Sequence, residues 1–253
     1  MMANERLRDA LLKAGLTPAA LADKLEVNAK TAERWITQDR PPYPRHRHAI
    51  AALLGEREVY LWPDAVSPER AARVNQSELV HVYPRRSAVP GDLWRRLIEG
   101  ATQHIGILVY AGLFLPEQEP RLVKVLKQKA KDGARVEILL GDPESEEVSA
   151  RGAEEGIGPA MAGKILNVLT FYGHLREATG VHARFHRTPL YNSIYRFDDE
   201  MLVNLHAYGF PAAHCPVLHL RRLSGGDLFD TYADSFDRVW SSGRPIWDDP
   251  VAG

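Results

Sequence analysis

The chain has 253 residues, of which 45% are hydrophobic and 26% are charged, and its formal net charge at pH 7 is −1. The composition is typical of a globular protein with a sizeable core, and the length predicts one large domain or two unequal ones. The near-zero charge excludes a polycation, so nucleic-acid binding would need a local basic patch. The single cysteine, Cys215, excludes an internal disulfide and fits a reducing cytoplasm. No signal peptide is expected in residues 1–15, and no apolar run reaches the roughly 20 residues of a membrane span.

The first 63 residues predict a bundle of four short helices. Leu7, Leu11 and Leu12 mark an apolar stripe on the first helix, which ends at Gly15. Prolines at residues 41, 42 and 44 break the chain before the fourth helix, and residues 61–63 would close the bundle. The caps and apolar positions of the other helices are Thr17 with Pro18, Asn28, and Ile50, Leu53 and Leu54 before Gly55.

Residues 17–36, TPAALADKLEVNAKTAERWI, have the spacing of two helices that cross at a tight turn. Ala22 is small enough for the two helices to cross closely, and the Val27 side chain would fill the space beneath the turn between them. The positions expected to fill the space between the helices are Leu25, Thr31 or Ala32, and Trp35. This spacing resembles the helix-turn-helix of the Cro/repressor-type (XRE) family over roughly residues 5–63. One departure is Glu26, at a turn position where glycine is common because it adopts a left-handed backbone without steric cost.

The resemblance implies binding to double-stranded DNA. A recognition helix enters the major groove with its N-terminus first and reads base edges with its early residues. Arg34 suits a bidentate contact to guanine, and Lys30 suits guanine or phosphate. The residues expected to contact DNA are Thr17, Asn28, Ala29, Lys30, Thr31 and Arg34, with Arg40, Arg45 and Arg47 on phosphates. The alternative is a packing or protein-interaction bundle, because residues 1–63 hold ten Lys and Arg against eight Asp and Glu, a surplus of only two.

Residues 64–79 are polar and predict a linker, and residues 80–253 predict a larger α/β domain. Strands that alternate with helices favour a mainly parallel sheet, and the strand-rich later part makes the sheet mixed. The expected strands are 81–83, 104–110, 134–140, 181–186, 193–197, 201–206 and 216–222. The expected helices surround Leu93–Ile98 and Leu122–Ala130 and cover 159–178 and about 227–240. The fold class is therefore α+β with two domains: an all-α bundle followed by an α/β mixed sheet.

Residues 93–143 resemble the first half of a phospholipase D-like domain: a helix, a strand, a glycine-bearing loop, a helix and the turn Asp132–Val136 into the next strand. Enzymes of that family place a histidine, a lysine two residues later and an aspartate five residues further on. If Asp198 matches the aspartate, Tyr191 stands at the histidine and Ser193 at the lysine. The resemblance therefore implies a related fold without the nucleophile or the phosphate-binding lysine, and no catalytic residue is expected.

Alternate residues of a strand face the same side, so Tyr191 and Ser193 would still point into the cleft that holds the active site in the resembled enzymes. The expected effector pocket is neutral and is formed by Tyr110, Tyr191, Ser193, Asn204 and His206. A pocket that has closed, in a domain that only dimerises, is the equal alternative. The resembled enzymes need two lobes, and this chain has room for one, so the resemblance implies a homodimer that presents two recognition helices to a palindromic site.

The sequence thus favours a cytoplasmic, nucleoid-associated transcription regulator with a homodimer partner and without a cofactor or membrane partner. The alternatives are a phosphodiesterase or nuclease targeted to DNA, and a protein-interaction module. His214, Cys215 and His219 lack the closer paired spacing of zinc ligands, so no metal site is expected. The acidic run at residues 142–147 predicts a helix start, and Asp198 with Asp199 predicts a hairpin turn.

Overall fold

A computed structural model describes residues 4–38, 40–63 and 76–247 of the chain. The chain divides into two compact units. Unit 1 comprises Met1–Ser77 and Leu223–Asp227, and unit 2 comprises Glu78–Arg222 and Leu228–Gly253. Most of the expected linker, residues 64–75, lies outside the described residues. The first strand begins at Leu79, so the end of the expected linker already belongs to the sheet of unit 2.

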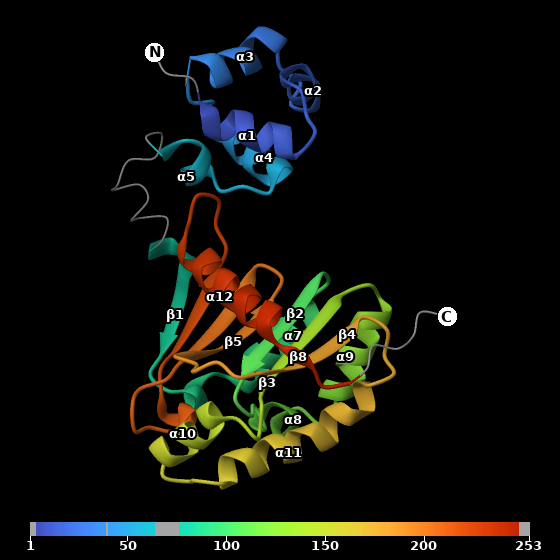
Figure 1. Ribbon diagram of the computed structural model, residues 1–253, viewed down its shortest axis with the longest axis vertical. Coiled ribbons are helices and arrows are strands. Elements are labelled where there is room, and N and C mark those ends of the chain that lie inside the picture. Colours follow the sequence, from blue (N-terminus) through green and yellow to red (C-terminus); the bar gives the residue numbers. More distant parts are fainter. Residues whose placement is uncertain (1–3, 39, 64–75, 248–253) are drawn as a thin grey trace. The chain divides into compact units, whose positions relative to one another are not determined.

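Unit 1 is helical in its described residues (Figure 1). Each of its first three helices begins at a side-chain cap. Two of these caps are the ones that the sequence predicts: Thr17 accepts from the amide of Ala20, and Asn28 accepts from the amide of Lys30. Asn4, which the sequence analysis did not single out, caps the first helix. The helices are α1 (Glu5–Lys13), α2 (Pro18–Lys24), α3 (Ala29–Thr37), α4 (Pro44–Leu54) and α5 (Glu58–Leu61).

One buried cluster holds unit 1 together. Ala22, Ala32 and Trp35 are buried in it, while Leu25 and Val27 are half-buried at the turn between α2 and α3, as the spacing predicts. The other buried members are Leu7, Ala10, Leu11, Leu21, Ile36, Ile50, Ala51, Leu61 and Trp62. Glu26 takes a left-handed backbone with φ of 53°, which is the conformation the turn requires.

The predicted apolar faces of α1 and α4 are partly wrong. Leu12 is 72% exposed, because it lies about 100° around the helix from Leu11, and Ala10 takes the inner position instead. Leu53 is exposed as well, while Ala51 is buried.

The core of unit 2 is an eight-stranded mixed sheet with the order β1-β7-β6-β5-β2-β3-β4-β8. β2, β3 and β4 are parallel, and the remaining neighbours are antiparallel. The predicted mixed sheet is therefore confirmed, but the expectation that it is mainly parallel is wrong, because only the β2–β3 and β3–β4 pairs are parallel. The strands are β1 (Leu79–Tyr83), β2 (His104–Val109), β3 (Arg135–Gly141), β4 (Val181–His186), β5 (Asn192–Phe197), β6 (Glu200–Leu205), β7 (Val217–Arg221) and β8 (Arg244–Pro245).

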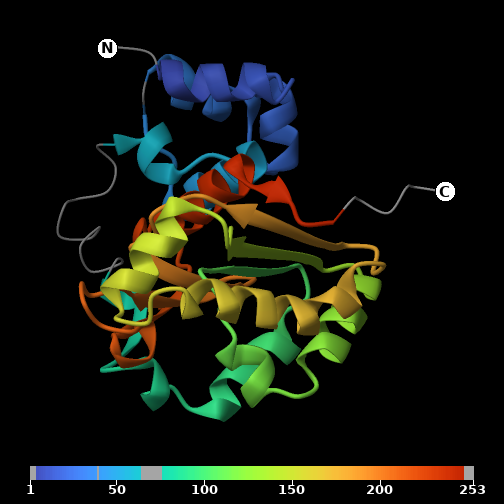
Figure 2. The same ribbon diagram turned by 60° about the horizontal axis from the view of Figure 1, so that its bottom comes forward.

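Helices cover both faces of this sheet (Figure 1). Alternation along β2 sends Ile105 and Ile107 to one face and Leu108 to the other. The first face packs against α7 (Gly91–Gly100), α8 (Phe114–Gln118), α9 (Leu122–Lys131), α10 (Glu146–Glu154) and α11 (Ala160–Tyr172). The second packs against α12 (Leu228–Ser242). Figure 2 shows α11, in gold, running along the side of the sheet away from the red α12.

The expected hairpin at Asp198 and Asp199 is confirmed, since the two residues connect β5 to β6 and Asp198 has φ of 51°. The Asp198 carboxylate also accepts from the amides of Thr102, Gln103 and His104 at 2.8, 2.9 and 2.7 Å. These bonds hold the entry to β2, and they lower the pKa of Asp198 even though burial of the carboxyl acts in the opposite direction. The turn residue therefore stabilises a strand nearly one hundred residues earlier in the chain.

The long helix expected over residues 159–178 is shorter in the structure. It ends at Tyr172 and continues as a 3₁₀ turn, Gly173–Leu175. In the residues that the structure describes, no helix has both the length and the apolar character that a membrane crossing requires.

Candidate functional site

The surface of α3 collects several of the residues expected to contact DNA. Asn28, Ala29, Lys30 and Arg34 are exposed, and Thr31 is half-buried. Lys30 and Arg34 are four residues apart, so they lie on one face of the helix. The backbone amides of the first turn of α3 point out of its N-terminal end, where the helix dipole favours negative charge. This surface therefore offers hydrogen-bond donors and two cations around a small residue, Ala29.

The basic residues that follow α3 are not equivalent. Arg40 and Arg45 are exposed, and Arg45 Nε lies 3.1 Å from His46 Nε2. Arg47 is only 6% exposed, donates to the carbonyl of Pro42 at 3.2 Å and pairs with Glu58 at 3.4 Å. The prediction that Arg47 contacts phosphate is therefore wrong, because its guanidinium is used inside the bundle to connect α4 to α5.

In unit 2, a cavity of about 220 Å³ opens where the ends of β2, β5 and β6 meet α11. Tyr110, Ser193 and His206 line it, as the sequence predicts. Tyr191 does not, because its side chain is 82% exposed. Asn204 does not either: it is fully buried, and its amide donates to the backbone carbonyls of residues 205, 215 and 216. Two of the five expected pocket residues are therefore corrected.

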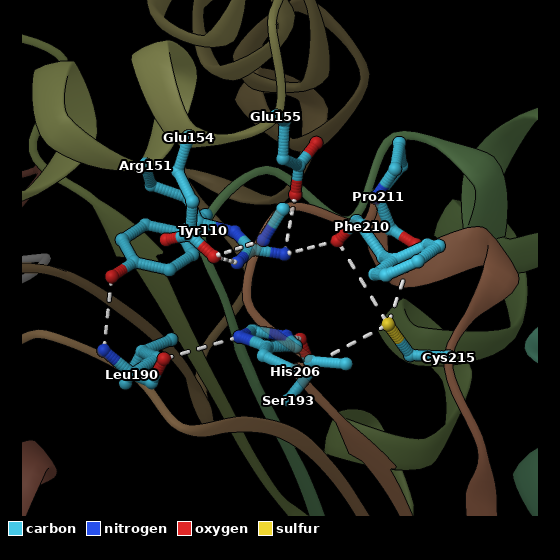
Figure 3. Close-up of polar contacts among 12 residues, drawn as sticks. Tyr110, Arg151, Glu154, Glu155, Leu190, Ser193, His206, Phe210, Pro211 and Cys215 are labelled. Atoms are coloured by element: carbon cyan, nitrogen blue, oxygen red, sulfur yellow. Dashed lines mark hydrogen bonds and ion pairs between the residues drawn. The ribbon is translucent and has the colours of Figure 1, made fainter.

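A chain of hydrogen bonds fixes the polar wall of the cavity (Figure 3). The Tyr110 hydroxyl accepts from the amide of Leu190 at 2.9 Å, and the carbonyl of Leu190 lies 3.1 Å from Nδ1 of His206. Because a carbonyl only accepts, Nδ1 carries the proton, and Nε2 accepts from the Ser193 hydroxyl at 3.1 Å. The imidazole is thus held in one tautomer and one orientation.

His206 is neutral near pH 7. Burial lowers its pKa to about 4, and the positive charges of Arg151 and Arg86 act in the same direction. Arg151 is 4% exposed and pairs with Glu154 and Glu155 at 2.7 Å each. It also donates to the carbonyl of Phe210 at 2.9 Å. Arg151 therefore connects α10 to the segment that follows His206.

The same segment is fixed by Cys215. Its buried sulfur lies 3.5 Å from the carbonyl of Pro211 and 3.8 Å from that of Phe210, and it accepts from the amide of Ala207 at 3.4 Å (Figure 3). Cys215 and His219 take no part in a common site, since His219 pairs with Glu200 at 2.7 Å. Among the described residues, no group of three or more histidines, cysteines and carboxylates is arranged to hold a metal ion.

The cavity-lining residues that sequence reasoning missed include Arg86, Lys164 and Tyr195. Tyr195 could have been found, because it lies two residues after Ser193 on the same face of a strand. Arg86 and Lys164 come from a 3₁₀ turn and from α11, and no local pattern relates either residue to Ser193. The expected lining consisted of uncharged groups alone, whereas the wall also includes these two cations and the carboxylates of Glu117 and Glu155, whose formal charges balance.

The geometry defines a protein with a helical unit that carries an exposed basic helix and a mixed α/β unit that carries a polar cavity. No protein-family model matches the chain, and no curated protein sequence matches it significantly. One similar solved structure is TrmBL2, an archaeal chromatin protein described with a novel mode of DNA binding. It is 14% identical, with a TM-score of 0.40, over 80% of this chain and 62% of that one. The alignment thus spans less than two thirds of TrmBL2.

A second similar structure is Nuc, a phospholipase D family member from Salmonella typhimurium. It is 18% identical, with a TM-score of 0.37, over 66% of this chain and 95% of that one. Both TM-scores are below 0.5, so the function of the chain is argued from its own residues.

Proposed function

We propose that the chain is a sequence-specific DNA-binding transcription regulator, in which α3 reads the major groove and unit 2 binds a small effector and another copy of the chain. The single observation that carries the proposal is the surface of α3. Its early residues are exposed and polar or small, and its other face is fixed against α2 by Ala32 and Trp35. A rigid helix that presents its first turns is the arrangement with which helix-turn-helix proteins contact base edges.

The chemistry of this surface supports separate roles for its residues. The Arg34 guanidinium can donate two parallel hydrogen bonds to the O6 and N7 atoms of guanine, and Lys30 can donate to either base or phosphate. Ala29 adds no bulk, so the helix can approach the bases closely. Arg40 and Arg45 are exposed and suit phosphate contacts, which position the protein without specifying the sequence.

The test is selection of bound fragments from a genomic DNA library, followed by fluorescence anisotropy on the recovered site. We expect the wild-type chain to recover a palindromic motif. The Lys30→Ala/Arg34→Ala variant should lose it, because each good base contact contributes about 1–3 kcal/mol of discrimination. The matched control is Arg8→Ala/Lys13→Ala, which also removes two exposed cations but from α1. Equal recovery by both double variants would show that α3 does not read sequence.

The hydrogen bond between Ser193 and His206 favours one second candidate, a hydrolase in which serine is the nucleophile and histidine the base. The regulator is preferred, since a pKa of about 4 makes His206 a weak base near pH 7. Incubation of the chain with bis-nitrophenyl phosphate and with plasmid DNA tests the alternative. Turnover that disappears in a His206→Asn variant would establish the hydrolase.

A further inference from the structure

The cavity of unit 2 contains a guanidinium that has no carboxylate partner. The side chain of Arg86 lies over the ring of Phe114, with 4.0 Å between the guanidinium carbon and the ring centroid. None of the salt bridges between described residues includes it. Stacking occupies the flat face of the guanidinium and leaves its N–H edge free to donate. An arginine in this arrangement is suited to bind a planar anion through two parallel hydrogen bonds.

A second polar group in the same cavity has no hydrogen-bond partner. The hydroxyl of Tyr195 is buried and makes no hydrogen bond of good geometry, although Ser193 and Arg86 lie near it, and the residue as a whole is 1% exposed. Burial raises the pKa of Tyr195 to about 12, although Arg86 and Ser193 act to lower it, so the hydroxyl keeps its proton and can donate. A buried donor without an acceptor costs about 1–3 kcal/mol, which a bound oxygen acceptor would recover. The Ser193 hydroxyl donates its proton to His206 and forms no hydrogen bond with the Tyr195 hydroxyl.

The cavity wall carries two cations, Arg86 and Lys164, and two carboxylates, Glu117 and Glu155, so its formal charges balance in number. Glu155 pairs with Arg151 at 2.7 Å, and Arg151 pairs with Glu154 at the same distance. Glu117 and Lys164 are both exposed, and they offset each other. No ion pair among the described residues includes Arg86, so its charge lies at the cavity wall without a direct counterion.

We propose that the cavity binds a small carboxylic acid, whose carboxylate accepts from Arg86 and Tyr195 and whose apolar body packs against Phe114, Leu113 and Met161. The lining residues supply both parts, since the apolar side chains lie beside the polar ones. A cavity of about 220 Å³ is smaller than the roughly 300–1,000 Å³ of pockets for drug-sized ligands. A single guanidinium without an ion-pair partner matches one carboxylate, whereas a phosphate group carries a charge of about −1.5 to −2 at pH 7.

Only the role of this acid as the effector rests on the proposed function. Binding of the acid is a property of unit 2 alone.

The experiment is calorimetry of the full chain with benzoate, hexanoate, benzamide and phenyl phosphate. We expect benzoate and hexanoate to bind, and benzamide and phenyl phosphate to bind at least tenfold more weakly. Arg86→Ala should weaken benzoate binding at least tenfold, and Arg86→Lys should weaken it less. Tyr195→Phe, which removes only the hydroxyl, should weaken it several-fold. Lys124→Ala, an exposed lysine of α9 outside the cavity wall, should leave binding unchanged.

Three outcomes would overturn the proposal. Benzamide binding as tightly as benzoate would show that the charge is not used. Phenyl phosphate binding more tightly than benzoate would assign the cavity to another class of anion. The absence of binding by all four compounds would show that the cavity is not a ligand site. Fluorescence anisotropy with DNA on the same Arg86→Ala protein distinguishes failure of the acid-binding proposal from failure of the regulator proposal. Arg86 is remote in sequence from α3, so its loss should leave DNA affinity in the absence of acid unchanged.

Discussion

Acidification should destabilise unit 2 through His206. The pKa of this imidazole falls from an ordinary value of 6.5 to about 4 in the folded chain, with burial as the main cause. The folded state therefore binds fewer protons than the unfolded state between these two values. Stability from the neutral imidazole is fully present above pH 6.5 and is lost as the pH falls towards 4.

The magnitude follows from the two pKa values. Lowering the pH from 7.5 to 5.0 costs about 2 kcal/mol of unfolding free energy for a group with these constants. Burial also lowers the pKa of His186 and of His219, so the wild-type chain should lose more than this amount in total. The contribution of His206 is isolated by His206→Asn, whose amide can still donate to the carbonyl of Leu190 but cannot titrate.

Urea unfolding at pH 7.5 and pH 5.0, at one ionic strength, measures the effect by tryptophan fluorescence. Trp94 reports on unit 2, because its ring packs edge-to-face against Tyr195 with 4.9 Å between centroids. The loss of stability between the two pH values should be smaller by about 2 kcal/mol in His206→Asn. With a urea slope of about 2 kcal/mol per molar, that difference is about 1 M in midpoint. An equal loss in both proteins would refute the argument that His206 is buried in its neutral form.

Three substitutions test other parts of the fold. Trp35→Ala should cost unit 1 about 3–5 kcal/mol, since the ring fills the space between α2 and α3, and the helical circular dichroism and DNA binding should fall together. Asp198→Ala should destabilise unit 2 by about 2–4 kcal/mol in urea unfolding, because it leaves three backbone amides without their acceptor; an unchanged midpoint would contradict this role. Gly152→Ala should destabilise the corner between α10 and α11, because a Cβ there would lie 2.3 Å from the carbonyl oxygen of Gly158. Thermal unfolding should show no loss for the control Gly100→Ala, where nothing lies within 4 Å.

Local chemistry explains what could be predicted from the sequence. Thr17 and Asn28 start helices because their oxygen atoms accept from nearby amides, and Asp198 forms a turn because it tolerates a positive φ. The alternation of β5 correctly placed Ser193 in the cavity wall. Each of these features depends on residues only a few positions apart.

The remaining features depend on contacts between distant parts of the chain. Arg47 is buried because Glu58 and Pro42 lie beside it, which no periodicity reveals. Arg86 lines the cavity only once β2, β5 and α11 have packed together. The Asn204 side chain lies outside the cavity because its amide donates to three backbone carbonyls. The sequence therefore predicted the location of the cavity but not the charged side chains in its wall.

The pairing of β2 with β5 has a consequence for how the cavity is acquired during folding. β5, β6 and β7 are neighbours in the sequence, but Ile105 pairs with Phe197, more than ninety residues away. Contacts of such long sequence separation form slowly, because the entropy of closing the intervening chain has to be overcome first. Tyr110 lies in the same cavity wall as Ser193 and His206 only once β2 has paired with β5. A molecule held there would bind only the folded state, so the free energy of unfolding of unit 2 would rise with its concentration.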